Sequence, residues 1–204
     1  MALIDNYKTG IWTAYIKHPQ VWLGAALLLS FLLFKRLYPA ASFIPDSYSY
    51  IAAAFHNMKI NIWPIGYSKV LRFVSVFTHS QLVLVWLQYL SLQLSLFHLV
   101  NRILAISPVN RYTRYLAIAV LFNPIVFYIS NMITSDAFFI ALSIVWFTQL
   151  LDLIFFFKTR TLWVHVLVLA LVFTFRYNGI FYPMISIGVI LLSAASRKAK
   201  ITTI

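Results

Sequence analysis

The stretch DAFFIALSIVWFTQLLDLIFFF, residues 136–157, decides the fold class. Apart from two aspartates it carries no charge, and a helix of about 20 apolar residues is long enough to cross a bilayer. Five further stretches of this kind lie at residues 19–38, 81–104, 113–130, 161–176 and 180–196. The sequence therefore predicts an all-α integral membrane protein with about six transmembrane helices.

The overall composition supports a membrane location. Hydrophobic residues make up 62% of the chain and charged residues 10%, and the mean hydropathy is +0.87, whereas about a quarter of the residues in a soluble domain are charged. The net charge of +12 does not indicate nucleic-acid binding, because the basic residues are spread between apolar stretches and form no single patch. We expect membrane lipid as a partner and no nucleic acid. The chain has no cysteine, which excludes disulfides and a cysteine nucleophile.

The first apolar stretch is a candidate signal peptide. Residues 21–34 have the length of its hydrophobic region, and the small residues of YPAAS follow at a plausible cleavage spacing. However, the segment before them is long, and Lys35 and Arg36 stand between the apolar run and that spacing. We therefore expect a retained membrane anchor.

One long connection, residues 39–80, separates the first two predicted helices, and long loops usually carry function. Residues 46–58 suit a helix lying on the membrane surface. Its polar face has Asp46, Ser49, Tyr50, Ala53 and Asn57, and its other face has Tyr48, Ile51 and Phe55. A second amphipathic helix is expected after the turn at Pro64 and Gly66. We predict one transmembrane domain over residues 1–204, with these interfacial helices in its outer loop.

Basic residues predict the orientation of the chain. Alternate loops hold ten and six of the 16 lysines and arginines, and the richer set is expected in the cytoplasm. Both termini are then cytoplasmic, and the long loop lies outside. Asp46, Asp136 and Arg176 fall on this outer side although they are far apart in the sequence.

Each of these three charged residues allows a structural and a functional interpretation. Asp46 either complements the dipole at the start of a surface helix or acts as a general base. Asp136 either caps the fourth helix, as Thr134 or Ser135 also could, or binds an acceptor or a metal. Arg176 either reaches lipid headgroups or binds a phosphate through its guanidinium fork.

The remaining ionisable residues give weaker signals. The five histidines show no metal-ligand spacing, and we interpret them as packing or interface residues. Asp152 is expected to pair with Lys158 or Arg160. Since no partner set for a protein-only metal cage is visible, a divalent cation (Mg or Mn) would have to share ligands with a substrate phosphate.

Three motifs together resemble the N-terminal half of the transmembrane module of polyprenyl-phosphate-dependent membrane glycosyltransferases of the GT-C fold. They are PDSYSYIAAAF with WPIGYSKVL (45–55 and 63–71), NPIVFYISNMITSDAFFIALS (123–143) and FRYNGIFYP (175–183). In that family an aspartate begins a surface helix in the first outer loop, a P-x-G-Y turn follows, and a second acidic residue precedes the fourth helix.

The resemblance implies an activity and roles for particular residues. The protein would transfer a sugar from a polyprenyl-phosphate donor to an acceptor on the outer face of a bacterial plasma (inner) membrane. Asp46 would deprotonate the acceptor, Asp136 would assist the acceptor or a metal, and Arg176 would hold the lipid phosphate. The other expected substrate-binding residues are Tyr50, Tyr67, Tyr177 and Asn178.

The sequence also departs from the family. Its members are usually several hundred residues long and have paired acidic residues where this sequence has single ones. The sequence is thus interpreted as a fragment, as a reduced protein that needs a protein partner subunit, or as a protein that has lost catalysis. The alternative function is a non-catalytic membrane subunit that binds partner helices or lipid.

Overall fold

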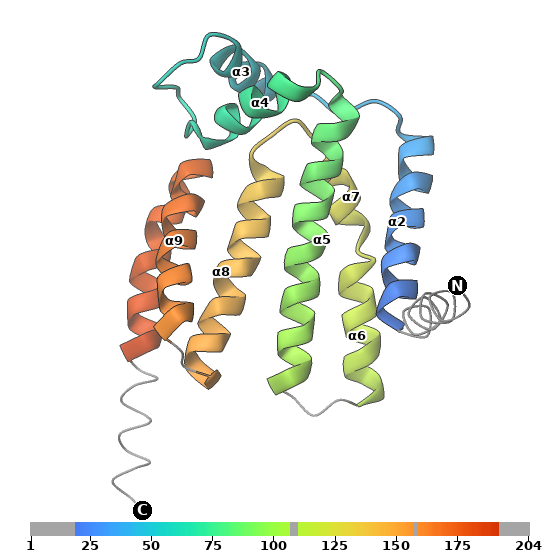
Figure 1. Cartoon of the computed structure of the whole chain (residues 1–204), viewed down its shortest axis with the longest axis vertical. Helices are drawn as coiled ribbons and strands as arrows, with labels where there is room; N and C mark the ends of the chain where they lie inside the picture. Colours follow the sequence, from blue (N-terminus) through green and yellow to red (C-terminus); the bar gives the residue numbers. More distant parts are fainter. Residues whose placement is uncertain (1–18, 107–109, 157–158, 192–204) are drawn as a thin grey trace, which may run out of the picture. The chain divides into compact units, whose positions relative to one another are not determined.

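The computed structural model describes residues 19–106, 110–156 and 159–191. Throughout these residues the regular structure is helical, with one isolated β-bridge and no strand (Figure 1). The all-α prediction is thus confirmed for this part of the chain. The chain divides into two compact units, Met1–Ala40 and Ala41–Ile204. The prediction of one domain over residues 1–204 stays a prediction.

The first unit contains α2 (Pro19–Leu37), which corresponds to the predicted anchor at 19–38. Lys35 and Arg36 lie in its last turn, where positive charges complement the negative end of the helix dipole.

The second unit begins with two short helices, α3 (Pro45–Phe55) and α4 (Gly66–Phe77). Longer and more apolar helices follow: α5 (Gln81–Ile106), α6 (Arg111–Leu121), α7 (Pro124–Asn131), α8 (Asp136–Phe156) and α9 (Thr159–Phe175). The short 3-10 helix η1 (Tyr177–Phe181) comes next and opens an apolar helical stretch, Tyr177–Leu191.

Three helical segments among the described residues are long and apolar enough to cross a membrane: Gln81–Ile106, Arg111–Asn131 and Asp136–Phe156. They correspond to the predicted spans at 81–104, 113–130 and 136–157. Thr159–Phe175 and Tyr177–Leu191 are apolar but shorter. The predicted spans at 19–38, 161–176 and 180–196 therefore stay predictions, and residues 192–196 lie outside the described residues.

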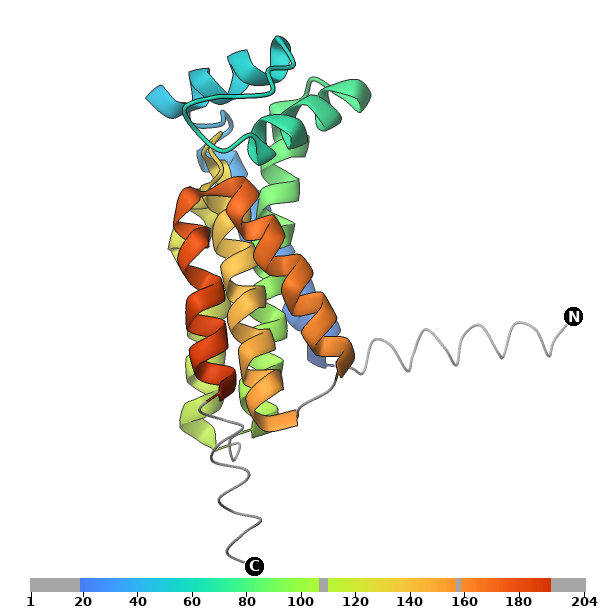
Figure 2. The ribbon, with the colours of Figure 1, turned by 90° about the vertical axis from the view of Figure 1, so that its left-hand side faces the viewer.

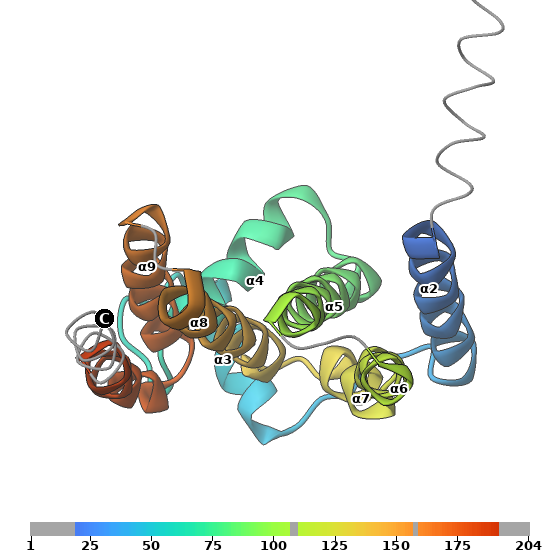
Figure 3. The same cartoon turned by 90° about the horizontal axis from the view of Figure 1, so that it is seen from below.

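The long helices pack side by side in the second unit. α8 contacts α5 on one side and α9 on the other, and α7 and α6 lie along α5 (Figure 3). The Arg111–Asn131 segment is broken in the middle, because Asn123 caps α7 by accepting a hydrogen bond from the Ile125 N–H at 3.0 Å, and Pro124 takes the first helical position.

A single ion pair joins α5 to α8 near the end of the unit that lies away from α3 and α4. Arg102 Nη2 donates to Asp152 Oδ2 at 3.1 Å, and Arg102 Nε lies 2.5 Å from Oδ1. The prediction that Asp152 pairs with Arg160 is therefore wrong, and Lys158 lies outside the described residues. Residues 50 positions apart in the sequence meet here because α5 and α8 run parallel, with the chain returning through α6 and α7, so that their C-terminal parts lie side by side.

The two short helices α3 and α4 pack on each other and cross over the ends of the longer helices (Figure 2). Two cations of α4 bind the C-terminal end of α3: Lys69 Nζ donates to Asn57 Oδ1 at 2.8 Å, and Arg72 Nη1 donates to the Ala54 carbonyl at 3.2 Å. Such positive charges satisfy carbonyls that the last helical turn leaves free.

The predicted helix in the long loop is confirmed, with α3 covering most of residues 46–58. Tyr50 and Ala53 face inward and are buried, whereas Tyr48 is 67% and Phe55 79% exposed. α4 likewise exposes Phe73, Val76 and Phe77. An apolar outer face on a helix pair at the end of spanning helices suits a membrane interface.

Candidate functional site

A parallel β-bridge brings the starts of α3 and α8 together. It pairs Ser42 with Met132, with the Ser42 N–H donating to the Asn131 carbonyl at 2.8 Å and the Ile133 N–H donating to the Ser42 carbonyl at 3.0 Å. Asp46 follows the bridge by four residues on one segment, and Asp136 follows it by four on the other. The two aspartates thus enter the same end of the unit, each in the first turn of a helix.

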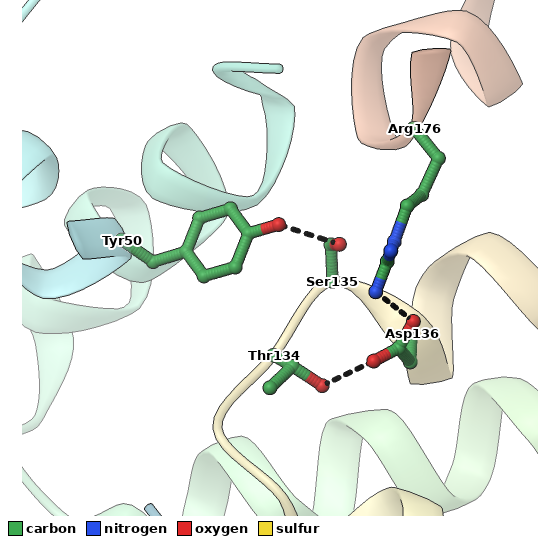
Figure 4. Close-up of polar contacts among 5 residues, drawn as sticks. All are labelled: Tyr50, Thr134, Ser135, Asp136 and Arg176. Carbon is green, nitrogen blue, oxygen red and sulfur yellow. Dashed lines mark hydrogen bonds and ion pairs between the residues drawn. The ribbon is translucent and has the colours of Figure 1, made fainter. Parts of the chain in front are cut away.

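Asp136 forms an ion pair with Arg176 (Figure 4). Its Oδ1 contacts Arg176 Nη2, and its Oδ2 accepts a hydrogen bond from the Thr134 hydroxyl at 3.0 Å. The Phe139 N–H donates to the Ser135 carbonyl at 2.9 Å, so Ser135 occupies the N-cap position of α8. Neither the capping interpretation of Asp136 nor the phosphate interpretation of Arg176 predicted that these two residues form an ion pair.

Tyr50 connects the surface helix to this ion pair. It is fully buried, and its hydroxyl shares a hydrogen bond of 2.9 Å with Ser135 Oγ (Figure 4). Burial raises the pKa of Tyr50; the Ser135 hydrogen bond and Arg176 oppose this rise, and Asp136 and Asp46 add to it. Tyr50, Ser135, Asp136 and Arg176 thus lie together, and Asp46 stands in the first turn of the helix that carries Tyr50.

Tyr67 lies behind Tyr50, with the two rings edge to face at 5.0 Å. It is fully buried, and its hydroxyl donates to Gln88 Oε1 at 2.8 Å. Burial, with smaller contributions from Tyr50 and Asp136, raises the pKa of Tyr67 well above its ordinary value. Gln88 Nε2 in turn donates to the Ser130 and Met132 carbonyls at 2.7 and 2.9 Å, which fixes the segment before Asp136.

The position of Arg176 depends on a close contact between the WPIGY turn and the end of α9. A Cβ atom at Gly66 would lie 2.5 Å from the Thr174 carbonyl oxygen, so only glycine fits here. The same turn places Trp63 with its ring centroid 6.0 Å from the Arg176 guanidinium carbon, within the range of a cation–π contact.

Tyr177, Asn178 and Gly179 form the turn after Arg176. The Gly179 N–H donates to the Arg176 carbonyl at 3.0 Å, and a Cβ at Gly179 would lie 2.9 Å from the Phe173 nitrogen. The turn therefore packs tightly on α9. Tyr177 is 51% exposed and Asn178 is also exposed, which leaves both accessible to a ligand.

The sequence-predicted residues fall into two groups in the structure. Asp46, Asp136 and Arg176 are half-buried at the surface of the site, and the Asp46 carboxylate makes no hydrogen bond or ion pair with any described residue. In contrast, Tyr50 and Tyr67 are buried and bonded to Ser135 and Gln88, so they support the site from behind.

Several residues of the site were not foreseen as functional: Trp63, Thr134, Ser135 and Gln88. Trp63 stands directly before the P-x-G-Y turn, which gave a local signal. Its contact with Arg176 spans more than a hundred residues and depends on how α4 packs against α9, which no local pattern indicates.

The described residues contain no group of three or more His, Cys, Asp or Glu side chains that could hold a metal ion. Asp46 and Asp136 are the carboxylates of the site, and Asp136 is engaged by Arg176. A divalent cation at this site would thus need additional oxygen ligands from a substrate.

The chain has helices suited to a membrane and, at one end of its second unit, a polar site of carboxylates, a guanidinium and aromatic rings. No protein-family model matches the chain, and comparisons with curated proteins and with solved structures found no match.

Proposed function

We propose that the protein is a membrane glycosyltransferase, or the N-terminal part of one, that transfers a sugar from a polyprenyl-phosphate donor to an acceptor on the outer face. The observation that carries this proposal is the Asp136–Arg176 ion pair at the end of the second unit where Asp46 begins α3, four residues after the bridge that also precedes Asp136. An acid–base group and a cation within one site are what displacement at a phosphorylated anomeric carbon requires.

In this proposal Asp46 takes the proton of the acceptor hydroxyl. The acceptor oxygen then forms a bond to the anomeric carbon, while the bond from that carbon to the donor phosphate oxygen breaks. The electron pair leaves with the polyprenyl phosphate, whose negative charge Arg176 stabilises. The Asp46 carboxylate suits this role, because no ion pair with a described residue blocks its approach to an acceptor hydroxyl.

The location of the site also supports the proposal. It lies where the spanning helix α8 begins and the amphipathic helix α3 crosses (Figure 1). A lipid-linked donor keeps its phosphate at the membrane surface and its chain in the bilayer, so a site at the end of a long apolar helix suits a reaction between the two substrates.

The change Asp46→Asn tests the proposal. It keeps the shape of the side chain and removes proton acceptance, and loss of a positioned base typically lowers a rate by about 10² to 10⁴. Membrane vesicles that contain the full chain are supplied with polyprenyl-phosphate hexoses and pentoses carrying a radiolabelled sugar. The label that leaves the lipid fraction for an acceptor is then measured.

Lys59→Gln is a matched control, because it removes a charge from the same loop at an exposed residue. It is expected to leave transfer within about twofold of the parent, in line with a surface substitution of small energetic effect. Transfer by Asp46→Asn within a fewfold of the parent would show that Asp46 only complements the α3 dipole. Absence of transfer by the parent would favour the alternative.

The alternative is a non-catalytic membrane subunit that binds partner helices or lipid. The specific observation in its favour is the exposed apolar face of α3 and α4, with Phe55, Phe73 and Phe77 each more than 60% exposed. A subunit of this kind would keep a stoichiometric partner on extraction with a mild detergent. The substitution Phe77→Ser should release that partner, and it leaves the Asp46 side chain itself unaltered.

A further inference from the structure

Arg176 meets Asp136 through only half of one guanidinium edge. Nη2 contacts Asp136 Oδ1, whereas Nε, which lies on the same edge, is buried and has no hydrogen-bond partner in the described part of the chain. A carboxylate that faced this edge with both oxygens would bond to both nitrogens. The pair therefore uses one contact where two are possible.

Thr134 is the reason for this geometry. Its hydroxyl donates to Asp136 Oδ2 at 3.0 Å, so the second carboxylate oxygen is directed toward Thr134 and away from Arg176 Nε (Figure 4). The side chains of Arg176 and Asp136 are 26% and 33% exposed, and partly exposed pairs with a single contact add little stability. The ion pair is thus one that a better ligand can replace.

We propose that Asp136 and Arg176 form a latch that a phosphate group opens. The phosphate binds the Nε and Nη2 edge of Arg176 with two oxygens and releases Asp136. The donor phosphate is a diester, so it carries one negative charge and two non-bridging oxygens, which can face Nε and Nη2 together and so satisfy the nitrogen that Asp136 leaves unpaired. This inference rests on the proposed function, which assigns Arg176 to the donor phosphate, and it adds that the phosphate site is closed before the donor binds.

Opening of the latch changes the charge of the site. With the guanidinium bound to phosphate, Asp136 keeps the Thr134 hydroxyl and loses its cation. Since the β-bridge holds the starts of α3 and α8 together, donor binding creates a second free carboxylate at the end of the unit that carries Asp46. The Asp136 carboxylate is then available to bind an acceptor only in the presence of donor.

Two substitutions with opposite expected effects test the latch. Asp136→Asn removes the competing charge, so it should tighten phosphate binding about threefold to fivefold, the factor that corresponds to an exposed ion pair. Thr134→Val keeps the shape but frees Oδ2 to reach Arg176 Nε, so it should weaken phosphate binding by a similar factor. A purely structural role of the pair predicts that neither variant binds more tightly than the parent.

The full chain is studied in phosphatidylcholine nanodiscs, with binding of inorganic phosphate followed by ³¹P NMR line broadening. A second set of nanodiscs contains phosphatidic acid, so that a lipid phosphate can be distinguished from a free one. If phosphatidic acid displaces inorganic phosphate, and does so with the same order of affinities among the variants, the site is assigned to a lipid headgroup. Absence of competition assigns it to free phosphate, and the latch stands in both cases. Arg176→Gln should abolish binding, and thermal unfolding verifies that each variant folds.

Unchanged or weaker phosphate binding by a folded Asp136→Asn variant overturns the latch. Unchanged or tighter phosphate binding by Thr134→Val also overturns it. If Asp136→Asn does not fold, the result for Thr134→Val decides alone. Absence of phosphate binding by both the parent and the variants also overturns it. Sugar transfer by the parent together with unchanged phosphate affinities would remove the latch and keep the transferase. The expected order of affinities without any transfer would keep the latch and remove the transferase.

Discussion

Gly66 is the residue at which the turn before α4 meets the end of α9. A Cβ there would lie 2.5 Å from the Thr174 carbonyl oxygen and 2.8 Å from Thr174 Oγ1, closer than side chains approach in folded proteins. Gly66→Ala is therefore expected to lower the free energy of unfolding by about 1 to 3 kcal/mol. Because Arg176 is two residues beyond Thr174, the change should also weaken phosphate binding.

Gly188→Ala is the control for this substitution. Nothing lies within 4 Å of a Cβ at Gly188, and alanine in a helix is favoured over glycine by about 0.5 to 1 kcal/mol. Thermal unfolding of both variants gives the comparison. Equal stability of the two variants would mean that the turn and α9 are not in close contact.

Residue-scale reasoning from the sequence identified Asp46, Asp136 and Arg176 and expected them at one side of the membrane. Their shared location at one end of the second unit agrees with that expectation. The contact of Asp136 with Arg176 could not be predicted, because it depends on the packing of α8 against α9. The burial of Tyr50 and Tyr67 was equally hidden, since an amphipathic pattern separates two faces without showing which of them is covered.

At the scale of elements, α4 holds α3 through charge. Lys69 and Arg72 bind groups at the α3 C-terminus, and each such cation contributes about 0.3 to 1 kcal/mol. The double change Lys69→Met and Arg72→Met should speed amide exchange at His56, Asn57 and Met58, whose N–H groups donate to carbonyls of the last α3 turn. Hydrogen exchange with mass spectrometry measures this effect, which we expect to be severalfold.

Lys59→Met is the matched control for exchange, since Lys59 is exposed on the same loop and donates no hydrogen bond to a described residue. It should leave exchange in α3 unchanged. Equal exchange in the double variant and the control would show that the apolar contacts of α3 with α4 hold the pair without these cations.

The helices were predictable to different degrees. Hydropathy and length located α5 and α8, because long apolar runs have one stable arrangement in a bilayer. The predicted span at 113–130 is broken between α6 and α7, although the Asn123–Pro124 dipeptide was visible in the sequence as a turn signal. Hydropathy averages over a window, so a break that keeps the segment apolar does not lower it.

For the whole molecule, the sequence predicts that the end of the second unit with the site faces outward and the opposite end faces the cytoplasm. Its described basic residues divide evenly. Lys59, Lys69, Arg72 and Arg176 lie in the α3–α4 connection, in α4 and after the end of α9, on the side of the site, and Arg102, Arg111, Arg114 and Arg160 lie near the end of α5 and the starts of α6 and α9, on the other side. The predicted orientation therefore depends on basic residues outside the described part of the chain, among them Lys8, Lys17 and Lys198.

Single cysteines can determine this orientation, because the chain has no cysteine of its own. Ile60, in the loop at the site end, is 86% exposed, and Tyr112, at the opposite end, is 77% exposed, so both positions are accessible and neither is part of the core. With the site outside, an impermeant thiol reagent should label Ile60→Cys in intact cells and Tyr112→Cys only after permeabilisation. The reverse pattern would place Asp46, Asp136 and Arg176 in the cytoplasm, where the proposed transfer to an outward-facing acceptor could not occur.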